Sequence, residues 1–123
     1  MIAALDHINI ETLDLERSVT FYRDVLGLEV GFRPNFGVPG AWLYAADAPL
    51  IHLVVRDAVN AGPTGAIHHI ALKAKGCGEW QARLSALAIA YDIMAVPDLG
   101  VTQLFITDPN GVRLELNFYD ETE

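Results

Sequence analysis

The sequence contains a single cysteine, Cys77, and few basic side chains among its 123 residues. One cysteine cannot form a disulfide within the chain, so nothing points to an oxidising compartment. Eight Lys and Arg stand against sixteen Asp and Glu, which gives a formal net charge of −8 and a pI near 4.8. Because non-specific binding to nucleic acid needs a cationic surface, we expect no nucleic-acid partner.

Long apolar runs are also missing from the sequence. No stretch reaches the roughly 20 apolar residues of a membrane span, and the first residues do not have the basic and apolar segments of a secretory signal. We therefore expect no membrane partner and a cytoplasmic location. Hydrophobic residues nevertheless make up 52% of the chain, which is ample for the core of one domain.

The predicted elements occur in the same order twice. The first set is a strand over 4–12, a helix between the N-cap Asp14 and Gly27, and strands over 28–33, 41–46 and 50–56. After a linker at 59–65, the second set is a strand over 66–75, a helix over 79–91 and strands over 92–96, 101–107 and 113–119. The sequence thus predicts an α+β fold of two strand-helix-strand-strand-strand modules, at about 1–58 and 66–120.

The last strand follows a strong turn signal, Asp108-Pro109-Asn110-Gly111. Proline presets φ at one position of a turn, and Asn-Gly tolerates the left-handed region that the turn then needs. In the strand that follows, Leu114, Leu116 and Phe118 alternate with polar residues. Glu115 is therefore expected on the polar face of the sheet.

Four side chains occupy equivalent positions in the two modules. His7 and His69 open the first strands, 62 residues apart, and His52 and Glu115 follow them by 45 and 46 residues in the last strands. All four fall on the polar phase of their strands, whereas His68 falls on the apolar phase. Imidazole and carboxylate together suit iron, zinc, nickel, cobalt or manganese, so these residues predict a site for one divalent metal ion.

Several segments resemble the vicinal oxygen chelate superfamily, which groups lactoylglutathione lyases, methylmalonyl-CoA epimerases, extradiol dioxygenases, and fosfomycin and bleomycin resistance proteins. The segments are Leu5-Asp6-His7-Ile8, Phe21-Tyr22-Arg23-Asp24-Val25-Leu26-Gly27-Leu28, Ile67-His68-His69-Ile70-Ala71, and the Asp108 to Gly111 turn before Leu114-Glu115-Leu116.

The resemblance implies a glyoxalase/dioxygenase-like fold, in which each βαβββ module curls into half of a cup-shaped mixed sheet. His7, His69 and Glu115 match the usual metal ligands of the superfamily, and His52 matches its fourth-strand ligand position. The resemblance further implies a homodimer whose sites can combine modules of both chains. It also implies a small-molecule substrate that chelates the metal through two neighbouring oxygens.

The activity within the superfamily stays open. Lactoylglutathione lyases hold glutathione with Arg and Asn where this chain has Glu11 and Arg56, so we do not expect glutathione as substrate. Coenzyme A thioesters need basic groups, which are few here, and the basic tail of fosfomycin transferases is absent. His7, His69 and Glu115 could form the iron triad of an extradiol dioxygenase, although Phe105 replaces the tyrosine usual there.

We therefore predict a metal-dependent isomerase, lyase or dioxygenase in which Glu115 is the proton-transfer group. Asn9, Trp42 and Arg56 are the candidate substrate-binding residues, although Trp42 could instead belong to the core and Arg56 could be a solvated charge. The loop over 34–40 is a candidate lid. The alternative function is a bleomycin-resistance-type protein that sequesters a small molecule at a dimer interface.

Overall fold

The structure of the chain is a computed structural model that describes residues 1–60 and 62–121. The chain divides into two compact units, Met1–Ala61 and Gly62–Glu123. The predicted linker at 59–65 spans this division, but Ala61 within it lies outside the described residues. The module limits of about 1–58 and 66–120 therefore stay a prediction.

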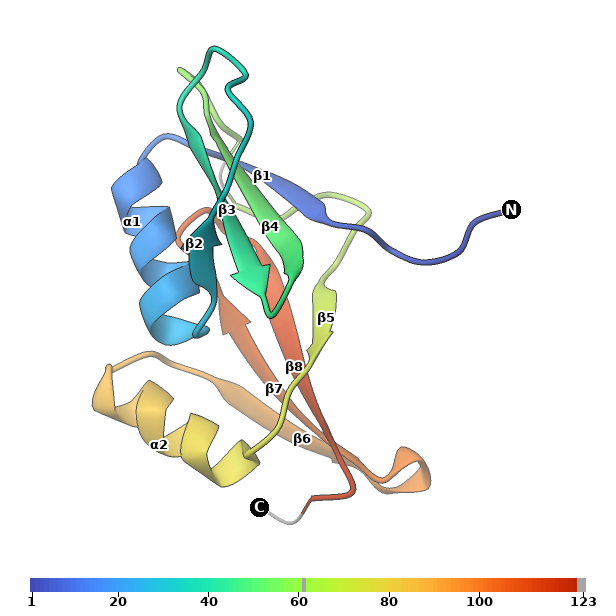
Figure 1. Cartoon of the computed structure of the whole chain (residues 1–123). Helices are drawn as coiled ribbons and strands as arrows, with labels where there is room; N and C mark the ends of the chain where they lie inside the picture. Colours follow the sequence, from blue (N-terminus) through green and yellow to red (C-terminus); the bar gives the residue numbers. More distant parts are fainter. Residues whose placement is uncertain (61, 122–123) are drawn as a thin grey trace. The chain divides into compact units, whose positions relative to one another are not determined.

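Each unit contains one four-stranded sheet (Figure 1). The first unit consists of β1 (Ile8–Thr12), α1 (Leu15–Thr20), the π-helical turn η1 (Phe21–Val25), β2 (Glu29–Gly31), β3 (Gly40–Ala45) and β4 (Ala48–Val55). The second consists of β5 (Ile70–Lys73), α2 (Cys77–Ala86), β6 (Asp92–Val96), the 3-10 turn η2 (Pro97–Leu99), β7 (Val101–Thr107) and β8 (Arg113–Tyr119).

The two sheets share one topology. Their strand orders are β1-β4-β3-β2 and β5-β8-β7-β6. The first strand runs parallel to the last in both sheets, and the other neighbours are antiparallel. The predicted α+β fold of two βαβββ modules is therefore confirmed.

The core of the first unit lies between its helical segment and its sheet. Tyr22 of η1, Leu43 of β3 and Ile51 of β4 are fully buried there. Asp14 is the N-cap, as predicted, because its Oδ1 accepts a hydrogen bond from the Arg17 backbone N–H at 3.0 Å. The helix ends before Gly27, which has a φ of +76°.

The second helix differs from the prediction at both ends. It begins at Cys77 rather than at 79, and the carboxylate of Glu121 accepts hydrogen bonds from the N–H groups of Gly76 and Cys77 at its N-terminus. It ends at Ala86 rather than at 91, because Ala88 takes a φ of +56°. Leu87, which lies inside the predicted helix but follows the observed one, is exposed. No helix in the described part of the chain is long and apolar enough to cross a membrane.

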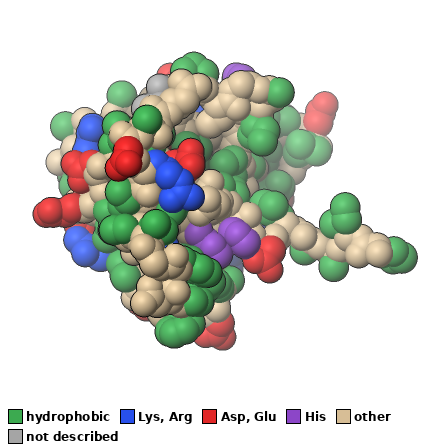
Figure 2. All heavy atoms as spheres, turned by 90° about the horizontal axis from the view of Figure 1, so that it is seen from above, with side chains coloured by type: hydrophobic (Ala, Val, Ile, Leu, Met, Phe, Trp, Pro, Cys, Tyr) green, Lys and Arg blue, Asp and Glu red, His purple; other side chains and the backbone are tan. Residues whose placement is uncertain are grey.

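The first strand of each unit is shorter than predicted. Pairing with β4 begins at Ile8, and pairing with β8 begins at Ile70, so the residues before these positions have no ladder partner. His7 and His69 therefore lie one residue before their strands. The chain before β1 leaves its sheet as an extended arm, visible in Figures 1 and 2, and Met1 and Ile2 on it are exposed.

The turn before β8 forms as predicted, and the Asp108 carboxylate organises it. Its Oδ1 accepts hydrogen bonds from the N–H groups of Asn110 and Val112, both at 2.8 Å. Gly111 takes a φ of +87°. The Asp108 N–H in turn donates to the Val112 carbonyl oxygen at 2.9 Å. This turn, in which Asp108 and Val112 are buried, sets where β8, the strand of Glu115, begins.

Replacing Asp108 with Ala should lower the free energy of unfolding by about 2 kcal/mol, because two backbone N–H groups lose their acceptor. Asp108→Asn retains a carbonyl oxygen that can accept these hydrogen bonds and should cost clearly less. Urea unfolding followed by circular dichroism measures both variants. Equal losses would mean that the charge of Asp108, rather than its role as acceptor, stabilises the turn.

Candidate metal centre

The two sheets give His52 and Glu115 the same position. His52 on β4 and Glu115 on β8 each lie in the last strand of their unit, between the parallel first strand and the antiparallel third. Their cross-strand neighbours are Asn9 and Trp42 for His52, and Ala71 and Phe105 for Glu115. Both are nearly covered, with exposed fractions of 9% and 6%. The repeat in the sequence is therefore also a repeat in strand register.

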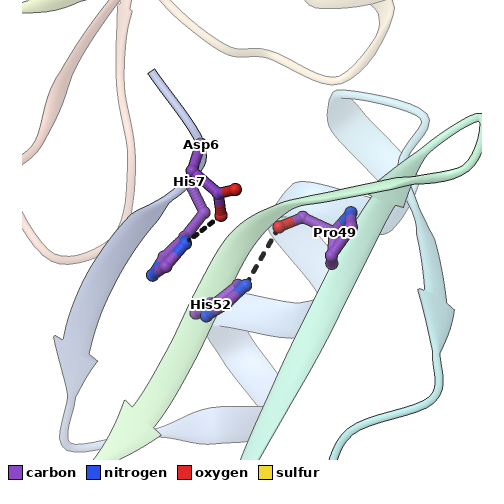
Figure 3. Close-up of polar contacts among 4 residues, drawn as sticks. All are labelled: Asp6, His7, Pro49 and His52. Carbon is purple, nitrogen blue, oxygen red and sulfur yellow. Dashed lines mark hydrogen bonds and ion pairs between the residues drawn. The ribbon is translucent and has the colours of Figure 1, made fainter. Parts of the chain in front are cut away.

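His7 and His52 stack ring on ring in the first unit (Figure 3). Their ring centroids are 3.7 Å apart and their planes differ by 9°. The Trp42 ring stacks on His52 at 4.0 Å, with an interplanar angle of 15°, so His52 lies between two rings. His7 Nδ1 is 2.6 Å from Asp6 Oδ1, and His52 Nε2 is 3.0 Å from the Pro49 carbonyl oxygen.

These hydrogen bonds assign the ring protons. A carbonyl oxygen only accepts, so His52 Nε2 carries a proton and the neutral ring keeps its lone pair on Nδ1. The Asp6 carboxylate makes His7 Nδ1 a donor in the same way and leaves His7 Nε2 free for a metal. Burial is the main cause that lowers the pKa of His52, and the nearby charges of His7 and Arg33 lower it further. The hydrogen bond to the Pro49 carbonyl and the charge of Asp6 raise the pKa, but they do not outweigh the other causes. His52 is therefore neutral near pH 7, the form that binds metals.

The stacked pair does not by itself have the geometry of two ligands on one ion. A ring nitrogen offers its lone pair in the plane of the ring, and the two planes here are nearly parallel. The lone pairs of His7 and His52 therefore point past any shared ion. One ring would have to turn about its side-chain bonds before both could bind the same metal.

His69 and Glu115 form the corresponding pair in the second unit. His69 Nε2 lies 3.2 Å from Glu115 Oε1. Two donors bound to one ion at about 2.1 Å, and separated by an angle of about 90–110°, lie about 3.0–3.4 Å apart. This pair therefore already has the spacing of two ligands. His69 Nδ1 is 2.8 Å from His68 Nδ1, and a proton on His69 Nδ1 in that contact leaves Nε2 free.

Each unit contains two of the four predicted ligands. Within the described residues 1–60 and 62–121, neither unit has a group of three or more His, Cys, Asp or Glu side chains that could hold a metal ion. The predicted set takes His7 and His52 from one unit and His69 and Glu115 from the other, and it stays a prediction. Its nitrogen and oxygen donors fit a divalent transition metal in type.

Sequence reasoning missed two partners of these histidines. Asp6 contacts the ring of His7, and His68 contacts the ring of His69. Each partner directly precedes its candidate ligand in the chain. A polar residue directly before a candidate histidine ligand was therefore the sequence signal that could have identified these partners. Histidine side chains also reach the surface together, beside an acidic side chain, on the face shown in Figure 2.

A pocket of about 480 Å³ lies beside His52 in the first unit. The three residues predicted to bind substrate, Asn9, Trp42 and Arg56, all line it, although their role stays a prediction. Arg56 Nε is also 3.2 Å from Glu11 Oε2, so these two side chains form an ion pair. The pocket has further lining residues that sequence reasoning did not single out, among them Arg33, Phe36 and Val38.

The repeated βαβββ module is the fold of glyoxalase-like proteins. The family model of the Glyoxalase/Bleomycin resistance protein/Dioxygenase superfamily matches residues 4–116, and the chain belongs to this superfamily. Among its relatives, Glyoxylase I 4 of Arabidopsis thaliana is 27% identical over 122 residues, which cover 94% of this chain and 70% of that protein.

Solved structures have the same fold. A Bacillus anthracis protein assigned to the glyoxalase family superposes with a TM-score of 0.80 at 22% identity and covers 97% of both chains. A variant of the fosfomycin resistance protein FosX from Listeria monocytogenes, complexed with Mn(II) and 1S,2S-dihydroxypropylphosphonic acid, superposes with a TM-score of 0.76 at 18% identity. The match covers 97% of this chain and 94% of FosX. At these identities the likeness establishes the fold.

The lowered pKa of His52 predicts a loss of stability in acid. In the unfolded chain His52 takes up its proton at about pH 6.5, whereas in the folded protein the pKa of His52 is lower. The contribution of neutral His52 to stability is therefore complete above about pH 6.5 and is lost as the pH falls towards the pKa of His52 in the folded protein. In metal-stripped protein, the wild type should lose more unfolding free energy between about pH 7.5 and 5.5 than His52→Gln does. Urea unfolding at both pH values measures this, and equal losses would contradict it.

Proposed function

We propose that the chain is a divalent-metal-dependent enzyme of the glyoxalase/dioxygenase type that acts on a small organic molecule with two neighbouring oxygens. The reaction is an isomerase or lyase step, or a ring-cleaving dioxygenation. The observation that carries the proposal is the convergence of His69 Nε2 and Glu115 Oε1 at 3.2 Å. Glu115 is buried, and in the described part of the chain His69 is the only basic side chain within ion-pair distance of it. Removing a carboxylate from water costs free energy unless hydrogen bonds or a positive charge replace the water, and one histidine contact replaces little of it. A bound metal cation would offset this cost.

His7, His52, His69 and Glu115 are the proposed ligands of one ion of iron, zinc, nickel, cobalt or manganese. When bound, such an ion supplies Lewis acidity towards the charge that develops on a substrate oxygen. The Mn(II) in the FosX complex and the name of the Arabidopsis relative support this kind of chemistry.

Glu115 is the proposed proton-transfer group. It is the one carboxylate in the ligand set, because His52 occupies the position where lactoylglutathione lyases have a glutamate. The contact with His69 orients Oε1 and leaves Oε2 as the oxygen that can take a proton from substrate and return it. Asn9, Trp42 and Arg56 would position the substrate in the pocket beside His52.

Glutathione is not part of the proposal. The two positions that hold glutathione in lactoylglutathione lyases are Glu11 and Arg56 here, and they pair with each other at 3.2 Å. Glu11 places a negative charge where a basic group would be needed for the carboxylates of glutathione.

We also propose a homodimer and module limits of about 1–58 and 66–120. We propose a cytoplasmic location as well, because a single cysteine suits a reducing compartment.

Metal content tests the proposed function directly. Protein purified without an affinity tag should contain about one transition metal per chain by elemental mass spectrometry, and Glu115→Gln and His52→Ala should lose most of it. Glu16→Gln is the matched control, because Glu16 lies exposed in the first turn of α1. Iron would favour dioxygenation, whereas nickel or zinc would favour isomerisation. Metal-free protein that also refuses added metal would contradict the proposal.

The second candidate is a protein that sequesters a small molecule at a dimer interface. One observation favours it: His7 and His52 are stacked and engaged with Asp6 and the Pro49 carbonyl rather than turned towards a common ion. A binding protein could use this stack as a flat wall for its ligand. Metal-free protein that binds small ligands without turnover would support this candidate.

A further inference from the structure

We infer that the pocket of the first unit selects small organic anions, and that Arg33 is the residue that recognises the anionic group. The inference rests on the proposed function and names its substrate class. In addition to its two neighbouring oxygens, the substrate would carry a carboxylate or similar group that Arg33 binds. Arg33 follows β2 and precedes the loop that leads into β3.

The guanidinium group of Arg33 is held from three sides. Its Nη1 donates a hydrogen bond to the Val38 carbonyl oxygen at 3.1 Å, and its Cζ lies 5.0 Å from the centre of the Phe36 ring. It also lies directly over Gly40, where an added Cβ would come within 2.6 Å of Nη2. An added Cβ would meet the Leu53 backbone carbonyl oxygen of β4 first, so close strand packing requires glycine at position 40, and the same glycine leaves room for the guanidinium group.

Arg33 nevertheless lacks an anionic partner. Among residues 1–60 and 62–121, no carboxylate lies within ion-pair distance of it, and its Nε is buried without a hydrogen-bond acceptor. The pocket lining contains no Asp or Glu, although the chain as a whole carries a net charge of −8. The other lining arginine, Arg56, already pairs with Glu11.

An anion in the pocket would give Arg33 the anionic partner and the hydrogen-bond acceptor that it lacks. A buried N–H without an acceptor is costly, and the planar guanidinium group binds a carboxylate through two parallel hydrogen bonds. A small turn of the Arg33 head group would present Nε and one Nη to such a ligand. Phe36 and Val38, which line the same pocket, offer apolar surface to the rest of the molecule. The expected occupant is therefore a carboxylate on an apolar skeleton.

The test compares benzoate with benzamide, two probes of nearly equal shape of which only the first is charged. The full chain is titrated with each, as purified and after removal of metal with a chelator. ¹H–¹⁵N NMR follows the Arg33 Nε–H signal in the wild type, and the backbone amide signals of the pocket residues in every variant. Benzoate should shift this signal and bind about tenfold more tightly than benzamide.

Arg33→Gln should reduce benzoate affinity to the level of benzamide. The matched control is Arg23→Gln, which removes the same charge from an exposed ion pair on η1, outside the pocket lining, and should leave affinity unchanged. Arg33→Lys, which retains the charge but not the two-pronged donor, should bind benzoate with intermediate affinity and replaces the Gln variant if that variant does not fold.

The outcomes separate this inference from the proposed function. Equal binding of the two probes, or benzoate binding that survives Arg33→Gln, overturns the inference whatever the metal content. Benzoate binding that depends on Arg33 in a protein that takes up no metal supports the anion subsite and contradicts the metal-dependent enzyme. Metal uptake without a preference for benzoate supports the metal-dependent enzyme and contradicts the anion subsite.

Discussion

The parallel pairing between the first and last strand of each unit is the constraint on which the candidate site depends. It brings His7 to His52 in the first unit and His69 to Glu115 in the second, because each of the two histidines lies one residue before its strand. A slip of one residue would turn the last-strand side chain to the face covered by helix, where a charged or polar group has no partner. The buried leucines on both sides of Glu115 oppose such a slip.

The two units use the same position for different chemistry. In the first, an aromatic stack surrounds His52, and a pocket with two arginines opens beside it. In the second, the neighbour of Glu115 on the parallel strand is only Ala71, and the carboxylate is left to a single histidine. On the proposed function, the first unit would recognise the ligand, and the second would supply the carboxylate that a cation or a proton requires.

Local patterns in the sequence predicted the features that depend on local physics. The Asp14 cap and the Asp108 turn required only neighbouring residues, and the structure has both. The end of α2 was not predictable in this way, because the apolar period runs on to Tyr91 while the backbone breaks at Ala88. The starts of β1 and β5 depend on where a distant strand offers a partner, which periodicity does not contain.

The side-chain contacts of the candidate site were the least predictable part, and Arg33 shows why. In the sequence Arg33 is one basic residue at the end of a strand. Its proposed role depends on the space above Gly40 and on the lack of Asp and Glu among the residues that line the pocket. The acidic surface does not cancel its effect. At physiological ionic strength, charges more than about 8 Å away are largely screened, so a ligand inside the pocket responds mainly to the side chains that line it. The net charge of −8, from which we expect no nucleic-acid partner, is therefore compatible with the proposed anion site.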